Sequence, residues 1–188
     1  DFQRKVHPYY AQQGEVRALD TIRFSINSHR GCYGECNFCA IAVHQGRTIT
    51  SRSQNSILNE AKKFVKDDNF KGVISDVGGP TANMYGFECA KKLKSGACKN
   101  KRCIFPETCK TLKPNHSAQI DLLNKLEKLQ GVNKVFVASG IRTDLVVDDL
   151  KSGKTYLKRV VGRHTSGQMK IAPEHTDRKI LNIMGKPG

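Results

Sequence analysis

Residues 21–39 read TIRFSINSHRGCYGECNFC, and the prediction of the fold starts from this stretch. Its first part, residues 21–27, alternates apolar and polar side chains in the way that is typical of a β-strand. A loop follows at once, and Gly31 and Gly34 allow the tight turns that a compact loop needs. The sequence therefore predicts a strand that leads directly into a loop with three cysteines.

Outward from this stretch, short apolar runs alternate with amphipathic segments. Strands are expected at residues 71–77, 134–139 and 168–172, and helices at 54–68, 117–130, 154–164 and 178–184. Strands that alternate with helices indicate parallel βαβ units and an α/β fold. Four strands are too few to close an eight-stranded barrel, so we expect an open, partial parallel (β/α) barrel or a larger barrel cut short.

One segment, residues 89–113, breaks the alternation because it is rich in lysine and lacks periodicity. We interpret it as an inserted, cysteine-rich loop within one domain that covers residues 1–188. The chain starts at Asp1 without a methionine and ends in Lys-Pro-Gly, so we expect a piece of a longer protein.

The composition is that of a globular protein. The 188 residues are 38% hydrophobic and 26% charged, which argues against disorder, collagen-like repeats and coiled coils. No window approaches the roughly 18 apolar residues of a membrane span, and no signal peptide is recognisable. We therefore expect a cytoplasmic protein that does not bind membranes.

The chain is strongly basic, with 32 Lys and Arg against 17 Asp and Glu and a net charge of +15. Such a charge attracts polyanions, among which nucleic acid is the obvious candidate. The sequence has no Trp and only 7% aromatic residues, so it lacks an obvious platform for stacking single-stranded bases. We therefore favour solvated helix faces over a nucleic-acid partner.

The first cysteine cluster, Cys32, Cys36 and Cys39, has the spacing C-x3-C-x2-C. Three thiolates this close repel one another unless a cation binds them, and thiolates select iron–sulfur clusters or zinc. A cubane cluster needs four ligands, so three cysteines would leave one iron open for a ligand from outside the protein. Plant-type ferredoxins and zinc sites use other spacings.

This motif, with Phe38 before its last cysteine and a strand before the loop, resembles the radical S-adenosylmethionine (SAM) superfamily. In that superfamily a [4Fe–4S] cluster chelates SAM and, once reduced, cleaves it to a 5′-deoxyadenosyl radical that abstracts hydrogen from a substrate. The resemblance implies that Cys32, Cys36 and Cys39 hold such a cluster. It also implies SAM as a cofactor and an electron donor such as flavodoxin or ferredoxin.

Longer strings carry a closer resemblance. They are HRGC at residues 29–32, HQGR at 44–47, SDVGGPTANMYG at 75–86 and IAPEHT at 171–176, and together they resemble the YgiQ-type family of radical SAM proteins. The resemblance covers nearly the whole chain. It implies the core domain of a radical SAM enzyme whose reaction is unassigned, and it supplies no substrate.

A glycine pair follows the second expected strand. Radical SAM proteins often have Gly-Gly-Glu there, and the resemblance implies that Gly78 and Gly79 contact the amino group of SAM. The sequence departs from this motif because Pro80 stands where the glutamate is usual. The backbone contact can survive this change, whereas a role for the glutamate cannot.

Polar residues also interrupt or follow the later strands, where α/β barrels collect their binding groups. Ser139 and Arg142 follow the third strand, and Lys170 and Glu174 belong to or follow the fourth. We predict that these four residues contact SAM or the substrate. If Lys170 points inward it needs a carboxylate partner, and otherwise it reaches water from an edge.

The second cysteine cluster comprises four residues within 21 positions and several neighbouring lysines: Cys89, Cys98, Cys103 and Cys109. Cationic neighbours favour thiolates, so a second metal site is expected, either an iron–sulfur cluster or a structural zinc. The alternative is a set of scattered buried thiols.

Two other functions compete with the radical SAM enzyme. A basic, zinc-stabilised nucleic-acid-binding module would be a colourless zinc protein that does not bind SAM. An iron–sulfur electron-transfer protein would need a fourth cysteine ligand for the first cluster, and none lies close to it in the sequence.

Overall fold

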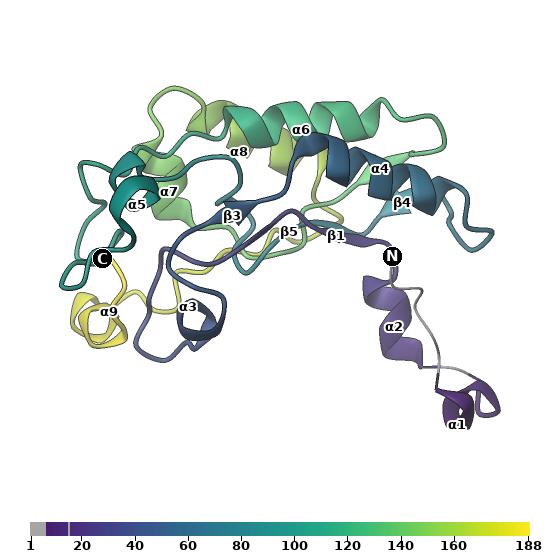
Figure 1. Cartoon of the computed structure of the whole chain (residues 1–188), viewed down its shortest axis with the longest axis horizontal. Coiled ribbons are helices and arrows are strands. Elements are labelled where there is room, and N and C mark those ends of the chain that lie inside the picture. Colours follow the sequence, from purple (N-terminus) through teal and green to yellow (C-terminus); the bar gives the residue numbers. More distant parts are fainter. Residues whose placement is uncertain (1–6, 15) are drawn as a thin grey trace.

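The computed structural model describes residues 7–14 and 16–188, in which short strands alternate with helices (Figure 1). The strands are β1 (Ser25–Asn27), β2 (His29–Arg30), β3 (Thr50–Ser51), β4 (Val73–Ile74), β5 (Asp76–Gly78) and β6 (Lys134–Val135). The helices are α1 (Pro8–Ala11), α2 (Arg17–Ile22), α3 (Ile41–His44), α4 (Gln54–Val65), α5 (Ala90–Ser95), α6 (Ser117–Glu127), α7 (Thr143–Asp148), α8 (Gly153–Arg163) and α9 (Arg178–Met184).

The strands pair as three small sheets. β1 pairs with β5 and β4 pairs with β6, both in parallel, whereas β2 and β3 are antiparallel. Backbone bonds connect the parallel pairs, because the N–H of Ser75 donates to Phe24 at 3.0 Å and that of Val77 donates to Phe136 at 2.9 Å. The described residues thus form an α/β fold whose small sheets do not close into a barrel. The partial barrel stays a prediction.

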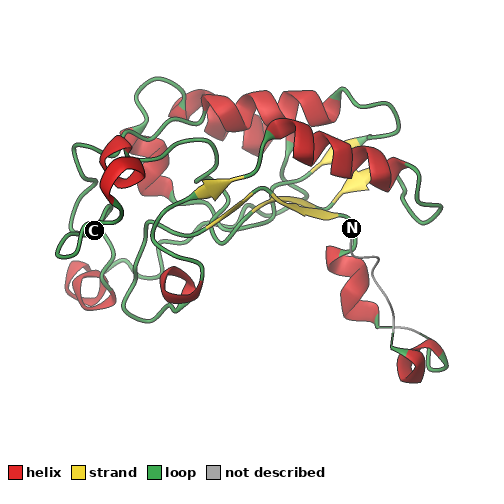
Figure 2. Ribbon diagram, in the orientation of Figure 1, coloured by secondary structure: helices red, strands yellow, loops and turns green. Residues whose placement is uncertain are grey.

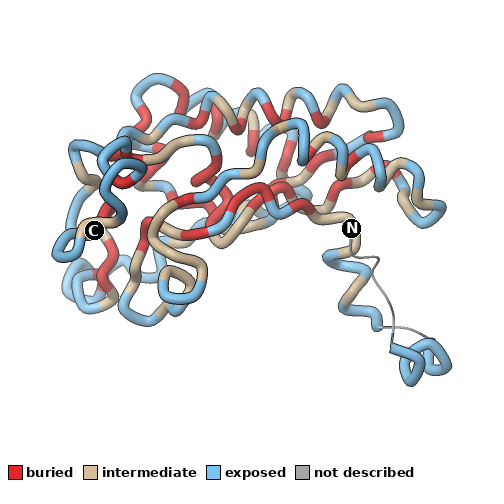
Figure 3. Tube along the Cα trace, in the orientation of Figure 1, coloured by how far each residue is buried: buried red, intermediate tan, exposed pale blue. Residues whose placement is uncertain are grey.

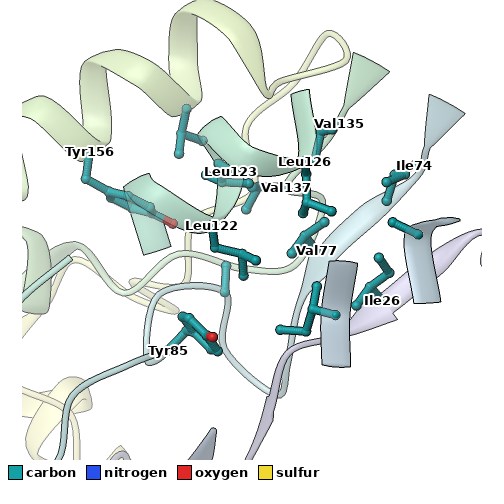
Figure 4. Close-up of a cluster of buried hydrophobic side chains, with 14 of the residues drawn as sticks. Ile26, Ile74, Val77, Tyr85, Leu122, Leu123, Leu126, Val135, Val137 and Tyr156 are labelled. Atoms are coloured by element: carbon teal, nitrogen blue, oxygen red, sulfur yellow. The ribbon is translucent and has the colours of Figure 1, made fainter. Parts of the chain in front are cut away.

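Three helices, α4, α6 and α8, lie together over one face of these strands (Figures 1 and 2). Their apolar sides point inward, where Leu122, Leu126 and Tyr156 are fully buried in one cluster with Ile26 and Val77 (Figure 4). Buried positions accordingly follow the strands and the inner sides of the helices (Figure 3). The helices thus cover one face of the strands, and the connecting loops lie at the carboxyl ends of the strands.

The expected strands are shorter than the sequence pattern suggested. In residues 21–27, the first two belong to α2, and the hydroxyl of Ser25 donates to the last carbonyl of that helix, on Ile22, at 2.7 Å. The strand at 71–77 is split into β4 and β5, and that at 134–139 keeps only β6. The prediction of a strand at 168–172 is wrong. In this segment only Ile171 pairs with another strand-like residue, in an isolated parallel bridge to Ile141.

The four expected helices are present. α9 has the predicted bounds, α8 is shifted by one residue, and α4 and α6 end three residues early at Val65 and Glu127. Within the expected insertion at 89–113, the structure forms the helix α5. Among the residues that the structure describes, no helix is both long enough and apolar enough to cross a membrane.

Candidate metal centre

The first cysteine loop connects β2 to α3. Gly31 opens it with φ +90°, and a side chain there would overlap the carbonyl of Thr48, so this turn requires glycine. The N–H of Cys32 donates to Gly46 at 3.1 Å, and the N–H of Cys39 donates to Cys36 at 3.0 Å. The loop is therefore folded back on itself by its own backbone.

Two sulfurs of this loop converge on Gly34. A Cβ atom on that residue would lie 3.3 Å from the sulfurs of both Cys32 and Cys36, and 3.4 Å from Nη1 of Arg142. The Gly34 N–H donates to the Cys32 sulfur at 3.3 Å, and the Thr81 hydroxyl lies 3.8 Å from the same atom. Bare backbone at Gly34 thus leaves room for both thiols and a guanidinium.

The third cysteine, Cys39, is half-buried on the same loop. Within residues 7–14 and 16–188, no three His, Cys, Asp or Glu side chains form a group that is arranged to hold a metal ion. All seven cysteines are free thiols. The structure therefore brings Cys32 and Cys36 together but does not gather Cys39 with them. The donor set fits a soft metal because it consists of thiols on one tightly turned loop.

Burial raises the pKa of the Cys32 thiol, and the Gly34 N–H, Thr81 and Arg142 oppose this effect. Arg142 is itself 5% exposed, and its Nη1 lies 3.8 Å from the Cys36 sulfur. Burial works against its charge, but the Asp144 carboxylate and the two sulfurs raise the pKa of the guanidinium above its ordinary value. A permanent positive charge is therefore held beside the first two thiols.

Arg142 is fixed through its backbone by Asn83. The amide oxygen of Asn83 accepts from the N–H of Arg142 at 2.8 Å, and the amide nitrogen donates to the carbonyl of Arg142 at 2.9 Å. The guanidinium is fixed in turn by both oxygens of Asp144, with Nε to Oδ1 at 3.0 Å. Sequence reasoning selected Arg142 but found neither of these partners.

The Asn83 contacts also decide the protonation of His116. Because the Asn83 amide nitrogen lies 3.1 Å from Nε2 of His116, that ring atom must accept, and the proton sits on Nδ1. Nδ1 donates to Asp149 at 2.7 Å. Burial lowers the pKa of His116, whereas hydrogen bonds from Ser152 and His116 hold the pKa of Asp149 below its ordinary value although burial opposes them.

The predicted SAM-binding residues Gly78, Gly79 and Ser139 share one small cavity of about 150 Å³ at the strand ends. Asp76 also lines it and organises it, because its carboxylate accepts from the N–H groups of Ala138 and Ser139 and from the Ser139 hydroxyl. A Cβ on Gly78 would lie 2.6 Å from the Ser139 oxygen. The structure thus unites three of the six predicted contacts.

His29 lies behind Gly79. A Cβ atom on this glycine would approach the imidazole ring to 2.7 Å, so the glycine makes room for the buried histidine. Burial lowers the pKa of His29 to about 4, although a hydrogen bond with the Thr81 backbone opposes the shift. His29 is therefore neutral at pH 7.

The last two predicted contacts are placed differently. Lys170 is exposed, so it does not point inward and does not need a carboxylate partner. Glu174, with φ +70°, instead pairs with Lys186, a residue that is 3% exposed, at 3.1 Å. Lys186 also donates to the carbonyl of Ala172. No pattern in the sequence indicates this pairing, because the two residues lie on either side of α9.

In the second cysteine cluster, Cys89 and Cys103 are buried, and Cys98 and Cys109 are half-buried. The hydroxyl of Thr111 lies 3.5 Å from the Cys89 sulfur and 3.2 Å from that of Cys109. Hydrogen bonds with Thr111 lower the pKa of both thiols, that of Cys109 to about 7, whereas burial raises the pKa of Cys103.

This second cluster packs against the first loop through Tyr33. The residue follows Cys32 in the sequence, and its side chain is fully buried. The Tyr33 hydroxyl donates to the carbonyl of Phe87 at 2.5 Å. Lys92, 4% exposed, lies 4.6 Å above the Tyr33 ring and 3.4 Å from Glu88. A larger cavity of about 630 Å³ lies away from both clusters, at the amino end of β6.

No family model matches the chain, but curated relatives align along its length. UPF0313 protein FN0734 of Fusobacterium nucleatum subsp. nucleatum is 61% identical over 188 residues, which are 100% of this chain and 33% of the relative. A UPF0313 protein of Clostridium botulinum (strain Okra / Type B1) is 48% identical over 186 residues, 99% of this chain and 29% of the relative. UPF0313 protein CPE1196 of Clostridium perfringens is 47% identical over 186 residues, 99% of this chain and 28% of the relative. The chain thus spans about a third of the length of these proteins and is, over that part, a homologue of UPF0313, the family to which YgiQ belongs.

Proposed function

We propose that this chain is the core of a radical SAM iron–sulfur enzyme, in which Cys32, Cys36 and Cys39 hold a [4Fe–4S] cluster. The observation that carries the proposal is the convergence of two sulfurs of a C-x3-C-x2-C loop on Gly34, beside the buried cation of Arg142. Thiolates select iron–sulfur clusters, and three of them leave one iron open to SAM. We further propose that the parallel strands belong to a partial (β/α) barrel.

Bound there, the cluster would supply the electron for the reductive cleavage of SAM, and a flavodoxin or ferredoxin would replace that electron. The residues of this chain have separate tasks. Arg142 offsets the negative charge of the cysteine thiolates. Gly78, Gly79 and Ser139 offer backbone and hydroxyl groups to the polar end of SAM from the strand-end cavity. Asp76 keeps the Ser139 hydroxyl in place.

The remaining predicted contacts are assigned to the substrate side. Glu174 lies in the segment before α9, where Lys186 pairs with its carboxylate. Lys170 is exposed and is free to meet a substrate that approaches from solvent.

The test is electron paramagnetic resonance of the full-length protein after anaerobic reconstitution and reduction by dithionite. We expect the signal of a reduced [4Fe–4S] cluster that changes when SAM is added. Cys36→Ser should remove this SAM-sensitive signal, and Ser166→Ala, at an exposed position, should keep it.

Two results would contradict the proposal. A cluster signal that is lost in Cys36→Ser but does not change with SAM would favour an electron-transfer protein. Zinc in place of iron would favour the basic, zinc-stabilised nucleic-acid module.

A further inference from the structure

We propose that Cys89, Cys98, Cys103 and Cys109 form a second, closed thiolate centre that binds a soft metal. The centre would tie the insertion at 89–113 to the first cysteine loop. This inference goes beyond the proposed function and does not depend on it, because it concerns different cysteines. A site with four protein thiolates leaves no coordination position open, which is typical of structural zinc and of clusters that do not bind substrate.

Three of the four cysteines belong to one buried cluster, although the first and the last lie 20 positions apart. Cys89 and Cys103 belong to this cluster, and Cys109 packs against it. The N–H of Cys109 donates to the carbonyl of Cys103 at 2.8 Å, which closes the intervening loop. The fold itself therefore brings these thiols together.

The sulfurs of Cys89 and Cys109 approach one shared atom, the hydroxyl oxygen of Thr111, at 3.5 Å and 3.2 Å. Two sulfurs that are far apart in the sequence thus lie within hydrogen-bonding distance of a single atom. The ammonium of Lys92 interacts with Cys103, and Lys101 carries positive charge close to Cys109. These cations offset part of the negative charge that four thiolates bring to a metal.

Cys98 completes the set. It is half-buried in the loop after α5 and lies five residues before Cys103. In the described part of the chain no three of these side chains surround a common point. Metal binding therefore requires the four side chains to rearrange around a common point and the Thr111 hydroxyl to withdraw from the sulfurs of Cys89 and Cys109.

A metal here would act on the first cysteine loop through Tyr33. This residue follows Cys32, is completely buried in the same cluster, and donates to Phe87, two residues before Cys89. Tyr33 cannot stay in place if the insertion loosens. The second centre thus stabilises the loop that carries Cys32 and Cys36.

The first experiment uses the full-length protein with Cys32→Ser, Cys36→Ser and Cys39→Ser, so that the first loop cannot bind metal. Zinc, iron and acid-labile sulfide are counted per chain, before and after the further changes Cys103→Ser and Cys109→Ser. We expect the further changes to remove roughly one zinc ion or one cluster per chain. Loss of zinc alone identifies a single ion, and joint loss of iron and sulfide identifies a cluster. Equal metal contents in the two proteins would overturn the proposal.

A second measurement needs no change in the insertion and so is independent of its folding. The same triple variant is labelled with N-ethylmaleimide before and after a chelator strips its metal, and the labelled peptides are mapped. We expect Cys98 and Cys109, the two half-buried thiols, to react only after stripping. Labelling of both at the same rate with and without the chelator would refute a metal centre.

Discussion

Gly78 has no side chain because Ser139 occupies the space that a side chain would need. A Cβ there would lie 2.6 Å from the Ser139 oxygen, which is held by Asp76 and cannot simply rotate away. We expect Gly78→Ala to lower the free energy of unfolding by about 1–3 kcal/mol, measured by urea denaturation.

The control for this prediction is Gly162→Ala, in α8. Apart from its chain neighbours and the backbone of α8, no described atom lies within 4 Å of its Cβ position, so the change should be neutral or slightly stabilising. In a Ser139→Gly background the obstacle is gone, and Gly78→Ala should then cost less. Equal costs in both backgrounds would show that Ser139 is not the reason for the glycine.

At the scale of elements, Asn83 clasps the segment before α7 by bonding both backbone groups of Arg142. Asn83→Ala leaves the N–H of Arg142 and Nε2 of His116 without partners in a buried place, and the Arg142 carbonyl keeps only the longer bond from the Val146 N–H at 3.4 Å. We expect a loss of about 2–4 kcal/mol in the free energy of unfolding. Asn100→Ala, at an exposed position, is the control. If Asn83→Ala lowered the free energy of unfolding as little as Asn100→Ala, the hydrogen bonds of Asn83 would not be important for stability.

The short helix α5 is anchored by the buried pair of Lys92 and Glu88, whose side chains are 2% and 7% exposed. Lys92→Met leaves the carboxylate without its cation and should cost about 3 kcal/mol of unfolding free energy. Adding Glu88→Gln should recover part of this cost. Lys91→Met, the exposed neighbour, should change little. If Lys91→Met lowered the free energy of unfolding as much as Lys92→Met, the loss would come from the apolar methionine side chain and not from the broken ion pair.

At the scale of the whole molecule, buried histidines make stability depend on pH. His29 has a folded pKa of about 4 against 6.5 in the unfolded chain, so the unfolded state binds the proton more readily. Its contribution to stability is complete above pH 6.5 and is lost as the pH falls toward 4. Between pH 7 and pH 5 this one residue should lower the free energy of unfolding by about 2 kcal/mol.

The measurement is urea denaturation at pH 7 and pH 5 for the unchanged chain and for His29→Gln. Burial also lowers the pKa of His116 and His164, so the total loss should exceed the part that His29→Gln removes. An unchanged pH dependence in His29→Gln would mean that this histidine accepts a proton without cost in the folded state.

The sequence predicted the four longest helices and missed the shorter ones. α4, α6, α8 and α9 carry apolar residues at helical spacing, because each presents one side to other parts of the chain. α1, α2, α3, α5 and α7 have only four to six residues, too few for a period to be visible. Strand lengths were overestimated because a ladder depends on its neighbour, which an isolated segment does not reveal.

The parts of the candidate site that could be predicted are those whose residues form a motif or follow a strand in the sequence. The C-x3-C-x2-C motif selected Cys32 and Cys36, the resemblance to the Gly-Gly-Glu motif selected Gly78, and the rule that ligands bind at strand ends selected Ser139. Asn83, His116 and Asp149 were not found, because each is 33 residues from the next and only the fold makes them neighbours. Buried hydrogen-bond networks of this kind leave no pattern in the sequence.

The ring proton of His116 offers a spectroscopic probe of the whole arrangement. It lies on a fully buried residue and points at Asp149, so it should exchange with water only when the structure opens locally. Such an imidazole proton resonates downfield of the amide protons and can be followed by nuclear magnetic resonance without assigning the backbone. His116 lies between the cysteine-rich insertion and α6, and through Asn83 it adjoins the residue beside the first thiols. The loss of that one signal would therefore report, in real time, the separation of the insertion from the body of the protein.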